Sequence, residues 1–174
     1  MSFNYQKKIY NNFNRITLIK NSFFNDKRGI LFSQYSDDLI KKEIKKKFTS
    51  FQDKIMFRKK NSLTGIHGDK KSWKLLSCLS GEILVVLVEC NKKSKNFGKY
   101  IKILLKGLDK KVLIIPPLIG NSYLCLKNKN IISYKILFNG KYYDYDEQFT
   151  YKWNDPHFKI KWPVKNPILS KRDK

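Results

Sequence analysis

The chain has 174 residues, of which 41% are hydrophobic and 14% aromatic, and its formal net charge is +23. This apolar content excludes an intrinsically disordered chain and suits one domain, residues 1–174, with a single sizeable core. No apolar run approaches the ~18 residues of a membrane span, and the first residues lack the apolar segment of a signal peptide, so we expect a cytoplasmic protein.

Most of the chain is expected to form short strands, because β-branched and aromatic residues cluster between Gly, Pro and Asn turn signals. In chain order, the predicted strands cover residues 30–35, 49–58, 73–79, 82–89, 100–105, 111–115, 122–126, 131–138 and 149–153. One helix is predicted after the first strand: Asp37 or Asp38 caps it, and its apolar stripe consists of Leu39, Ile40, Ile44 and Phe48. Asn139-Gly140 predicts a two-residue hairpin turn, since both residues tolerate positive φ. So many short strands predict an all-β sandwich or barrel.

The soft metal ligands follow no metal-binding pattern. Cys78, Cys90 and Cys125 lie in apolar contexts without CxxC spacing, which indicates buried free thiols in a reducing compartment. The spacing of His67 and His157 matches no structural zinc motif, and His157 is expected at the surface. We therefore expect no metal site.

The most specific pattern surrounds His67. Residues 60–69 read Lys-Asn-Ser-Leu-Thr-Gly-Ile-His-Gly-Asp, and Lys74 opens the segment KLLSCLSGE at 74–82. A lone histidine in a β-protein is most often a packed or surface residue, so His67 by itself indicates no function. Further short motifs accompany it in a fixed order along the chain: NDKRGILF (25–32), FQD (51–53), SKNFG (94–98), IP (115–116), YK (134–135), WND (153–155), IKWP (160–163) and LSKRD (169–173).

These motifs, in this order and spacing, resemble those of the dTDP-4-dehydrorhamnose 3,5-epimerase family over about residues 24–173. The family segment N-x-x-R-G-L-H, which carries the catalytic base, is similar to residues 61–67. The family strand K-L-V-x-C-x-x-G-E is similar to residues 74–82. A closer branch, the epimerases of GDP-linked 4-keto-6-deoxy heptoses used in bacterial capsules, reads G-I-H-G-D and G-N, like residues 65–69 and 120–121.

The resemblance implies an all-β cupin jelly-roll barrel with one or two short helices, acting as a homodimer without a cofactor. The implied reaction inverts C3, or C3 and C5, of a GDP- or dTDP-linked 4-keto-6-deoxy sugar for surface polysaccharide such as capsule or lipopolysaccharide. A ketone at C4 acidifies the protons at C3 and C5, because the carbanion delocalises onto oxygen as an enolate. Inversion then needs a base on one face and an acid on the other.

By resemblance, His67 is the catalytic base and Asp173 orients its imidazole. Lys74 is expected to place positive charge at the developing oxyanion, and Tyr134 to deliver a proton from the other face. Alternation along strands would let these side chains converge inside the barrel.

Substrate binding is expected from five further residues. Arg28 matches a family position that binds the nucleotide diphosphate, often from the partner subunit, although it is also suited to shaping a turn beside Gly29. Gln52, Asn61 and Asn121 are expected at the sugar or its phosphates, although Asn61 is equally suited to satisfying loop backbone. Thr64 stands where the family usually has arginine, which removes a fixed cation, and Asn121 stands where it has a second histidine. Because base, carboxylate, lysine and tyrosine all remain, the pattern favours an active enzyme with altered specificity.

Two other functions stay open. Thr64 in place of arginine is also compatible with a cupin that binds a nucleotide sugar without catalysis. The net charge is compatible with a nucleic-acid-binding β-domain, whose affinity would fall steeply with salt. Against that, lysines are spread from Lys7 to Lys174 in a chain without alanine, as expected from a genome poor in G and C, and no aromatic platform for RNA is recognisable. We expect neither a nucleic-acid nor a membrane partner.

Overall fold

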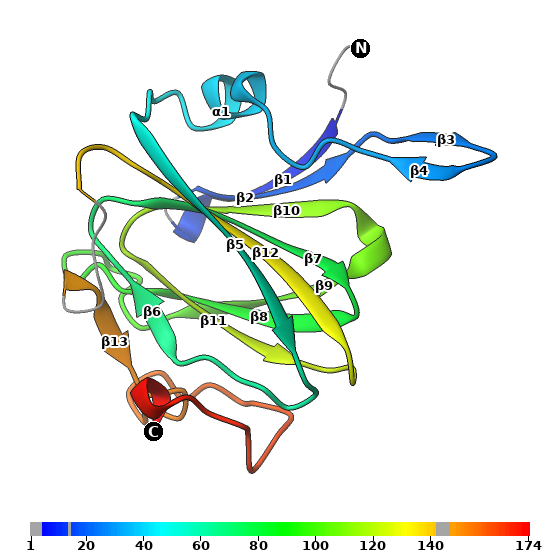
Figure 1. Cartoon of the computed structure of the whole chain (residues 1–174). Coiled ribbons are helices and arrows are strands. Elements are labelled where there is room, and N and C mark those ends of the chain that lie inside the picture. Colours follow the sequence, from blue (N-terminus) through cyan, green and yellow to red (C-terminus); the bar gives the residue numbers. More distant parts are fainter. Residues whose placement is uncertain (1–4, 14, 142–146) are drawn as a thin grey trace.

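The computed structural model describes residues 5–13, 15–141 and 147–174, and in it two antiparallel sheets pack face to face (Figure 1). The six-stranded sheet has the order β1 (Tyr5–Tyr10), β2 (Ile16–Asn21), β10 (Lys111–Ile115), β7 (Trp73–Ser80), β12 (Asn130–Phe138) and β5 (Ser50–Arg58). The five-stranded sheet has the order β13 (Phe149–Tyr151), β6 (Ile66–Gly68), β11 (Ile119–Cys125), β8 (Glu82–Glu89) and β9 (Tyr100–Lys106). The predicted all-β fold is confirmed.

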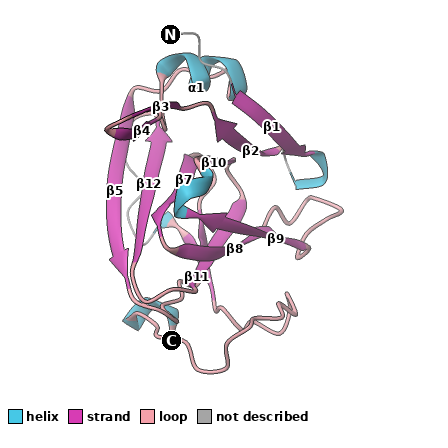
Figure 2. Ribbon diagram, turned by 90° about the vertical axis from the view of Figure 1, so that its right-hand side faces the viewer, coloured by secondary structure: helices cyan, strands magenta, loops and turns pink. Residues whose placement is uncertain are grey.

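Short elements complete the architecture. Strands β3 (Phe24–Asp26) and β4 (Gly29–Leu31) form a hairpin that projects from the body of the molecule (Figure 1). The helix α1 (Asp37–Glu43) lies at one end of the body (Figure 2). Short 3-10 helices include η1 (Asn11–Phe13), η2 (Gly107–Asp109) and η4 (Lys171–Asp173). Within the described ranges, no helix is long and apolar enough to cross a bilayer.

Strand alternation places neighbouring apolar residues of β7 in two different cores. On β7, Leu76 points between the sheets and packs with Leu113, Val85 and Leu87. The neighbouring Leu75 points to the opposite face and packs against the helix residues Leu39, Ile40 and Ile44. The predicted apolar stripe of the helix is therefore packed on the outer face of the six-stranded sheet. Cys78, Cys90 and Cys125 are buried and free, as predicted.

Three local predictions need correction. The helix cap is Ser36, whose hydroxyl accepts a hydrogen bond from the Leu39 backbone N–H at 3.1 Å, so the prediction of Asp37 or Asp38 is wrong. Phe48 lies beyond the helix, although it still packs against the same core. The predicted hairpin at Asn139-Gly140 is wrong, because β12 pairs with β5 and β7 while β13 pairs with β6 in the other sheet.

Strand boundaries differ mainly in the N-terminal part. Of the predicted strand 30–35, only residues 30 and 31 are in a strand, which is β4. Strands β1, β2, β3 and β6 were not predicted. Strand β11 begins at Ile119 and therefore includes Gly120 and Asn121. This earlier start matters for the site, because it places Asn121 within the sheet and opposite His67 in register.

Candidate active site

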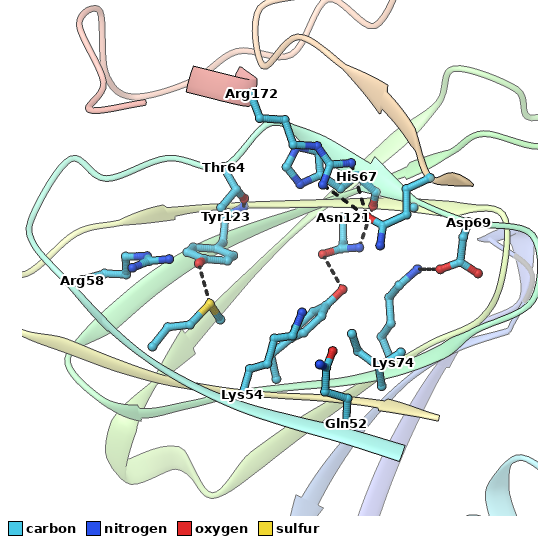
Figure 3. A pocket seen from close by; sticks show the side chains of 15 residues that line it. Gln52, Lys54, Arg58, Thr64, His67, Asp69, Lys74, Asn121, Tyr123 and Arg172 are labelled. Carbon is cyan, nitrogen blue, oxygen red and sulfur yellow. Dashed lines mark hydrogen bonds and ion pairs between the residues drawn. The ribbon is translucent and has the colours of Figure 1, made fainter. Parts of the chain in front are cut away.

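A cavity of about 530 Å³ lies between the two sheets (Figure 3). Its walls come from β5, β12 and β7 on one side and from β6 and β11 on the other. Six of the nine residues predicted from the sequence to form the site line it: Gln52, Thr64, His67, Lys74, Asn121 and Tyr134. Asp173 lies directly behind His67. The fold therefore brings together residues that are far apart in the chain.

His67 sits on the short strand β6 and is held by a buried carboxylate. Its Nε2 lies 2.7 Å from Oδ1 of Asp173, which is only 3% exposed, and the Ser170 hydroxyl donates to Oδ2 at 2.7 Å. Burial opposes ionisation of Asp173, but hydrogen bonds from His67 and Ser170 outweigh it and hold the pKa of this carboxyl below its usual value. The carboxylate is therefore charged and fixes the orientation of the imidazole.

Gly65 makes room for this pair. A β-carbon at position 65 would lie 2.6 Å from Oδ1 of Asp173 and 3.3 Å from Nε2 of His67. The Gly65 backbone N–H also donates to the Asp173 carboxylate. Only a residue without a side chain allows the carboxylate to approach the backbone this closely, which gives the glycine of the Gly-Ile-His segment a physical role.

Lys74 is buried in an ion pair with Asp69. Its Nζ lies 2.9 Å from Oδ2 of Asp69, and both side chains are almost fully buried. The backbone N–H groups of Lys71 and Ser72 donate to Oδ1 of Asp69 at 2.8 and 2.5 Å. Burial lowers the pKa of Lys74, although the charge of Asp69 acts against this shift. Burial alone would raise the pKa of Asp69, but Lys74 and the two backbone N–H groups hold that pKa below its usual value. Asp69 thus anchors the lysine at the cavity wall.

Asn121 links the two walls of the cavity. Its Nδ2 donates to the backbone carbonyl of His67 at 2.7 Å, and its Oδ1 accepts a hydrogen bond from the Tyr134 hydroxyl at 3.3 Å. Tyr134 belongs to β12 in the six-stranded sheet, whereas His67 belongs to β6 in the five-stranded sheet. The phenol and the imidazole therefore enter the cavity from opposite sheets.

Thr64 has a structural contact in addition to its place in the cavity lining. Its Oγ1 accepts a hydrogen bond from the backbone N–H of Tyr123 at 3.1 Å, and its backbone carbonyl accepts one from the Ser122 hydroxyl at 2.5 Å. These bonds attach the segment before β6 to β11. The short side chain thus secures the loop rather than presenting a charge to the cavity.

Two predicted binding residues do not line the cavity. Arg28 is exposed in the turn between β3 and β4, where its Nη2 lies 2.5 Å from Oδ2 of Asp26. Asn61 has a φ of +63°; its backbone N–H donates to the Cys125 carbonyl and its carbonyl accepts from the Ile168 N–H, both at 2.8 Å. Within one chain, Arg28 shapes a turn and Asn61 satisfies loop backbone, so their substrate roles stay predictions. His157 is exposed, as predicted.

Three basic residues that were not predicted as site residues also line the cavity: Lys54, Arg58 and Arg172 (Figure 3). Lys54 and Arg58 lie two and six residues after Gln52 on a predicted strand, so alternation was the signal that would have found them. Arg172 donates to the oxygens of Thr150 and Gln148 from a 3-10 turn, and only its place beside Asp173 pointed to it.

The arrangement is suited to moving protons. A histidine backed by a charged carboxylate can accept a proton, a phenol on the other wall can donate one, and the lysine can stabilise negative charge that develops between them. Among the residues that the structure describes, no group of three or more His, Cys, Asp or Glu side chains is placed to hold a metal ion.

Comparisons with known proteins agree with this geometry. The family model for dTDP-4-dehydrorhamnose 3,5-epimerase matches residues 11–174. A curated relative of that name from Salmonella typhimurium is 30% identical over 91% of this chain and 87% of its own length. A crystal structure of the Bacillus anthracis protein of that name, with TDP and PPi bound, is 27% identical over 97% of each chain, with a TM-score of 0.84.

The likeness extends to more distant structures. The 3,5-epimerase of Legionella pneumophila, solved with dTDP-4-keto-L-rhamnose, shares the fold with a TM-score of 0.85 at 23% identity, over 99% of this chain and 90% of that one. The two facing antiparallel sheets are thus the cupin jelly roll of these enzymes. From the extent of the family match and the shared fold, we conclude that this chain belongs to the dTDP-4-dehydrorhamnose 3,5-epimerase family, which makes it a sugar isomerase.

Proposed function

We propose that this protein inverts C3, or C3 and C5, of a nucleoside-diphosphate 4-keto-6-deoxy sugar. The observation that carries the proposal is the arrangement across one cavity, with His67 and its partner Asp173 on one wall and Tyr134 on the other. Inversion needs a base on one face of the sugar ring and an acid on the opposite face. Two proton-transferring groups that enter from opposite sheets meet that need.

The proposed mechanism assigns one step to each residue. Because Nε2 of His67 is engaged by Asp173, its other ring nitrogen, Nδ1, takes the proton from the carbon next to the C4 ketone. The electron pair moves onto the ketone oxygen to form an enolate, which the buried ammonium of Lys74 stabilises. Tyr134 then donates its proton to the same carbon from the other face, and the configuration is inverted.

Solvent exchange tests the proposal directly. The purified protein is incubated in D2O with GDP- or dTDP-linked 4-keto-6-deoxy sugars, and loss of the C3 and C5 proton signals is followed by NMR. We expect loss at C3 with inversion, and loss at C5 as well if the ring can turn in the cavity. A protein that binds these compounds tightly without any exchange is the non-catalytic binding module, and the epimerase proposal is then wrong.

The choice of substrate rests on the branch motifs. Gly65 to Asp69 and Gly120-Asn121 read like the branch that acts on GDP-linked heptoses, which favours a GDP-linked sugar destined for capsule. The TDP bound to the Bacillus anthracis relative supports a nucleotide-linked substrate in general. The three buried free thiols suit a reducing compartment such as the cytoplasm, where we propose that the reaction takes place. In the exchange experiment, we expect a higher kcat/KM for the GDP-linked heptose than for the dTDP-linked hexose.

We further propose a homodimer joined at the outer face of β5, the edge strand of the six-stranded sheet. Phe51, Ile55 and Phe57 are exposed on this face, with Phe57 at 72%, and the β3–β4 hairpin exposes further large apolar side chains. An edge strand that carries such a row is a template for pairing with a second copy. In that dimer, we propose that Arg28 of one chain contacts the diphosphate of the substrate bound in the cavity of the other chain.

Sedimentation velocity tests the dimer. We expect the wild type at twice the 20.7 kDa mass of one chain and Phe57→Lys at the mass of one chain, because a charge in the apolar interface is costly to bury. Leu108→Lys is the matched control, since Leu108 is 83% exposed on η2 and away from β5. A wild type that sediments as one chain at micromolar concentration would rule the dimer out.

A further inference from the structure

The inner face of β5 carries two cations into the cavity. Gln52, Lys54, Met56 and Arg58 alternate along the strand and all line the cavity. Asp53, the acid nearest to them in sequence, points to the other face and pairs with Lys135 at 2.6 Å. Strand alternation therefore separates the basic residues of β5 from the acidic one, and it leaves the positive charge on the cavity side.

On the facing wall of the cavity, Thr64 stands where the resemblance to the family leads us to expect an arginine. The Thr64 hydroxyl accepts a hydrogen bond from the backbone N–H of Tyr123, and the side chain of Arg58 lies beside Tyr123 (Figure 3). Burial raises the pKa of the Tyr123 phenol, and the charge and hydrogen bond of Arg58 act against that rise. Arg58 therefore reaches the corner of the cavity that Thr64 forms, although it enters from the opposite sheet.

Strand register places the two cations relative to the reacting groups. Lys54 lies directly opposite Tyr134 in the β5–β12 pair, and Arg58 lies four residues further along, opposite Asn130. Four residues of extended strand span about 13 Å. The two side chains thus line one wall from the level of Tyr134 along β5, over a length that suits a sugar and its attached phosphates.

We propose that Lys54 and Arg58 together bind the diphosphate of the substrate and replace the arginine that the family carries at position 64. This inference rests on the proposed function, because it assumes a nucleoside-diphosphate sugar in the cavity. Ammonium and guanidinium groups form charge-assisted hydrogen bonds with phosphate that are roughly twice as strong as neutral ones. Arg172 lies at the other wall of the cavity, on the side of His67, where its guanidinium donates to Thr150 and Gln148 (Figure 3).

Binding of GDP and dTDP, measured by calorimetry, tests the inference without requiring catalysis. We expect the double variant Lys54→Gln/Arg58→Gln to lose roughly 100-fold in affinity for the preferred nucleotide, and to bind with a weaker dependence on salt. The matched control is Lys59→Gln/Lys60→Gln, which removes the same charge from exposed residues just beyond β5. The control is expected to bind within threefold of the wild type.

Adding Thr64→Arg to the double variant completes the test. If the cations are interchangeable, this third change restores affinity at least tenfold. Unchanged binding by the double variant, an equal loss in the control, or a folded triple variant without recovery would each overturn the inference. Should the double variant fail to fold, the two single variants serve in its place. Deuterium exchange by the wild type decides the proposed function separately, so failure of one is distinguishable from failure of the other.

Discussion

The variant His67→Asn is expected to lower the rate of deuterium exchange at C3 by at least about a thousandfold. Asparagine has no nitrogen that can accept a proton at neutral pH, so the Asp173 carboxylate is left without a base to orient. General base catalysis by a positioned side chain contributes about 10²–10⁴-fold, and the upper part of that range applies where a charged carboxylate supports the base. NMR exchange rates under single-turnover conditions measure the loss.

The chain provides its own control for this experiment. His157 is exposed, lies outside the cavity lining, and contacts the ring of Phe97 at a centroid distance of 5.7 Å. His157→Asn is therefore expected to exchange at the wild-type rate. Nucleotide affinity of His67→Asn should stay within threefold of the wild type, because His67 is assigned to the reacting carbon and not to the phosphates. Exchange by His67→Asn at more than a tenth of the wild-type rate would remove His67 from the role of base.

The strands of the middle of the chain were the predictable part of the fold. Strands β7 to β10 are separated by the turn residues Gly81, Gly98 and Gly107, and their predicted bounds match the structure within one residue. Exposure alone did not decide the outcome. Strand β5 was predicted within one residue although most of its residues are exposed, whereas β1, which reads YQKKIY and exposes three of its six residues, was missed. The three-residue strand β6 is too short for any periodicity, and it forms only because β11 and β13 pair with it on either side.

Six of the nine predicted site residues line the cavity, but the geometry that joins them was not predictable. His67 and Asp173 are paired at 2.7 Å although they lie far apart in the chain, and no local pattern predicts such a contact. Their assignment came from a resemblance between motifs. Lys54 and Arg58 belong to no motif, so they were missed, although alternation from Gln52 would have pointed the same way. Asp69 was quoted only as part of a motif, because a buried partner for Lys74 is a tertiary property.

The variant Tyr134→Phe is expected to separate proton removal from inversion. His67 is unchanged, so it can remove the proton and return it, as deuterium, to the same face of the ring. We expect C3 exchange at no less than a tenth of the wild-type rate, while formation of the inverted product falls at least about a hundredfold, because water in the cavity is a poor substitute for a positioned phenol. Exchange and inversion are both read from one NMR time course.

A second phenol in the same cavity makes the comparison sharp. Tyr123 also lines the cavity, but its hydroxyl lies 3.3 Å from Sδ of Met56 and beside Arg58, away from Asn121 and the strand of His67. Tyr123→Phe is therefore expected to keep inversion and exchange coupled as in the wild type. If Tyr134→Phe loses exchange and inversion in equal measure, Tyr134 acts before or during proton removal, and the acid on the far face must be another group. If inversion survives in Tyr134→Phe and fails in Tyr123→Phe, the two tyrosines exchange roles, and the wall that delivers the proton lies on β11 instead of β12.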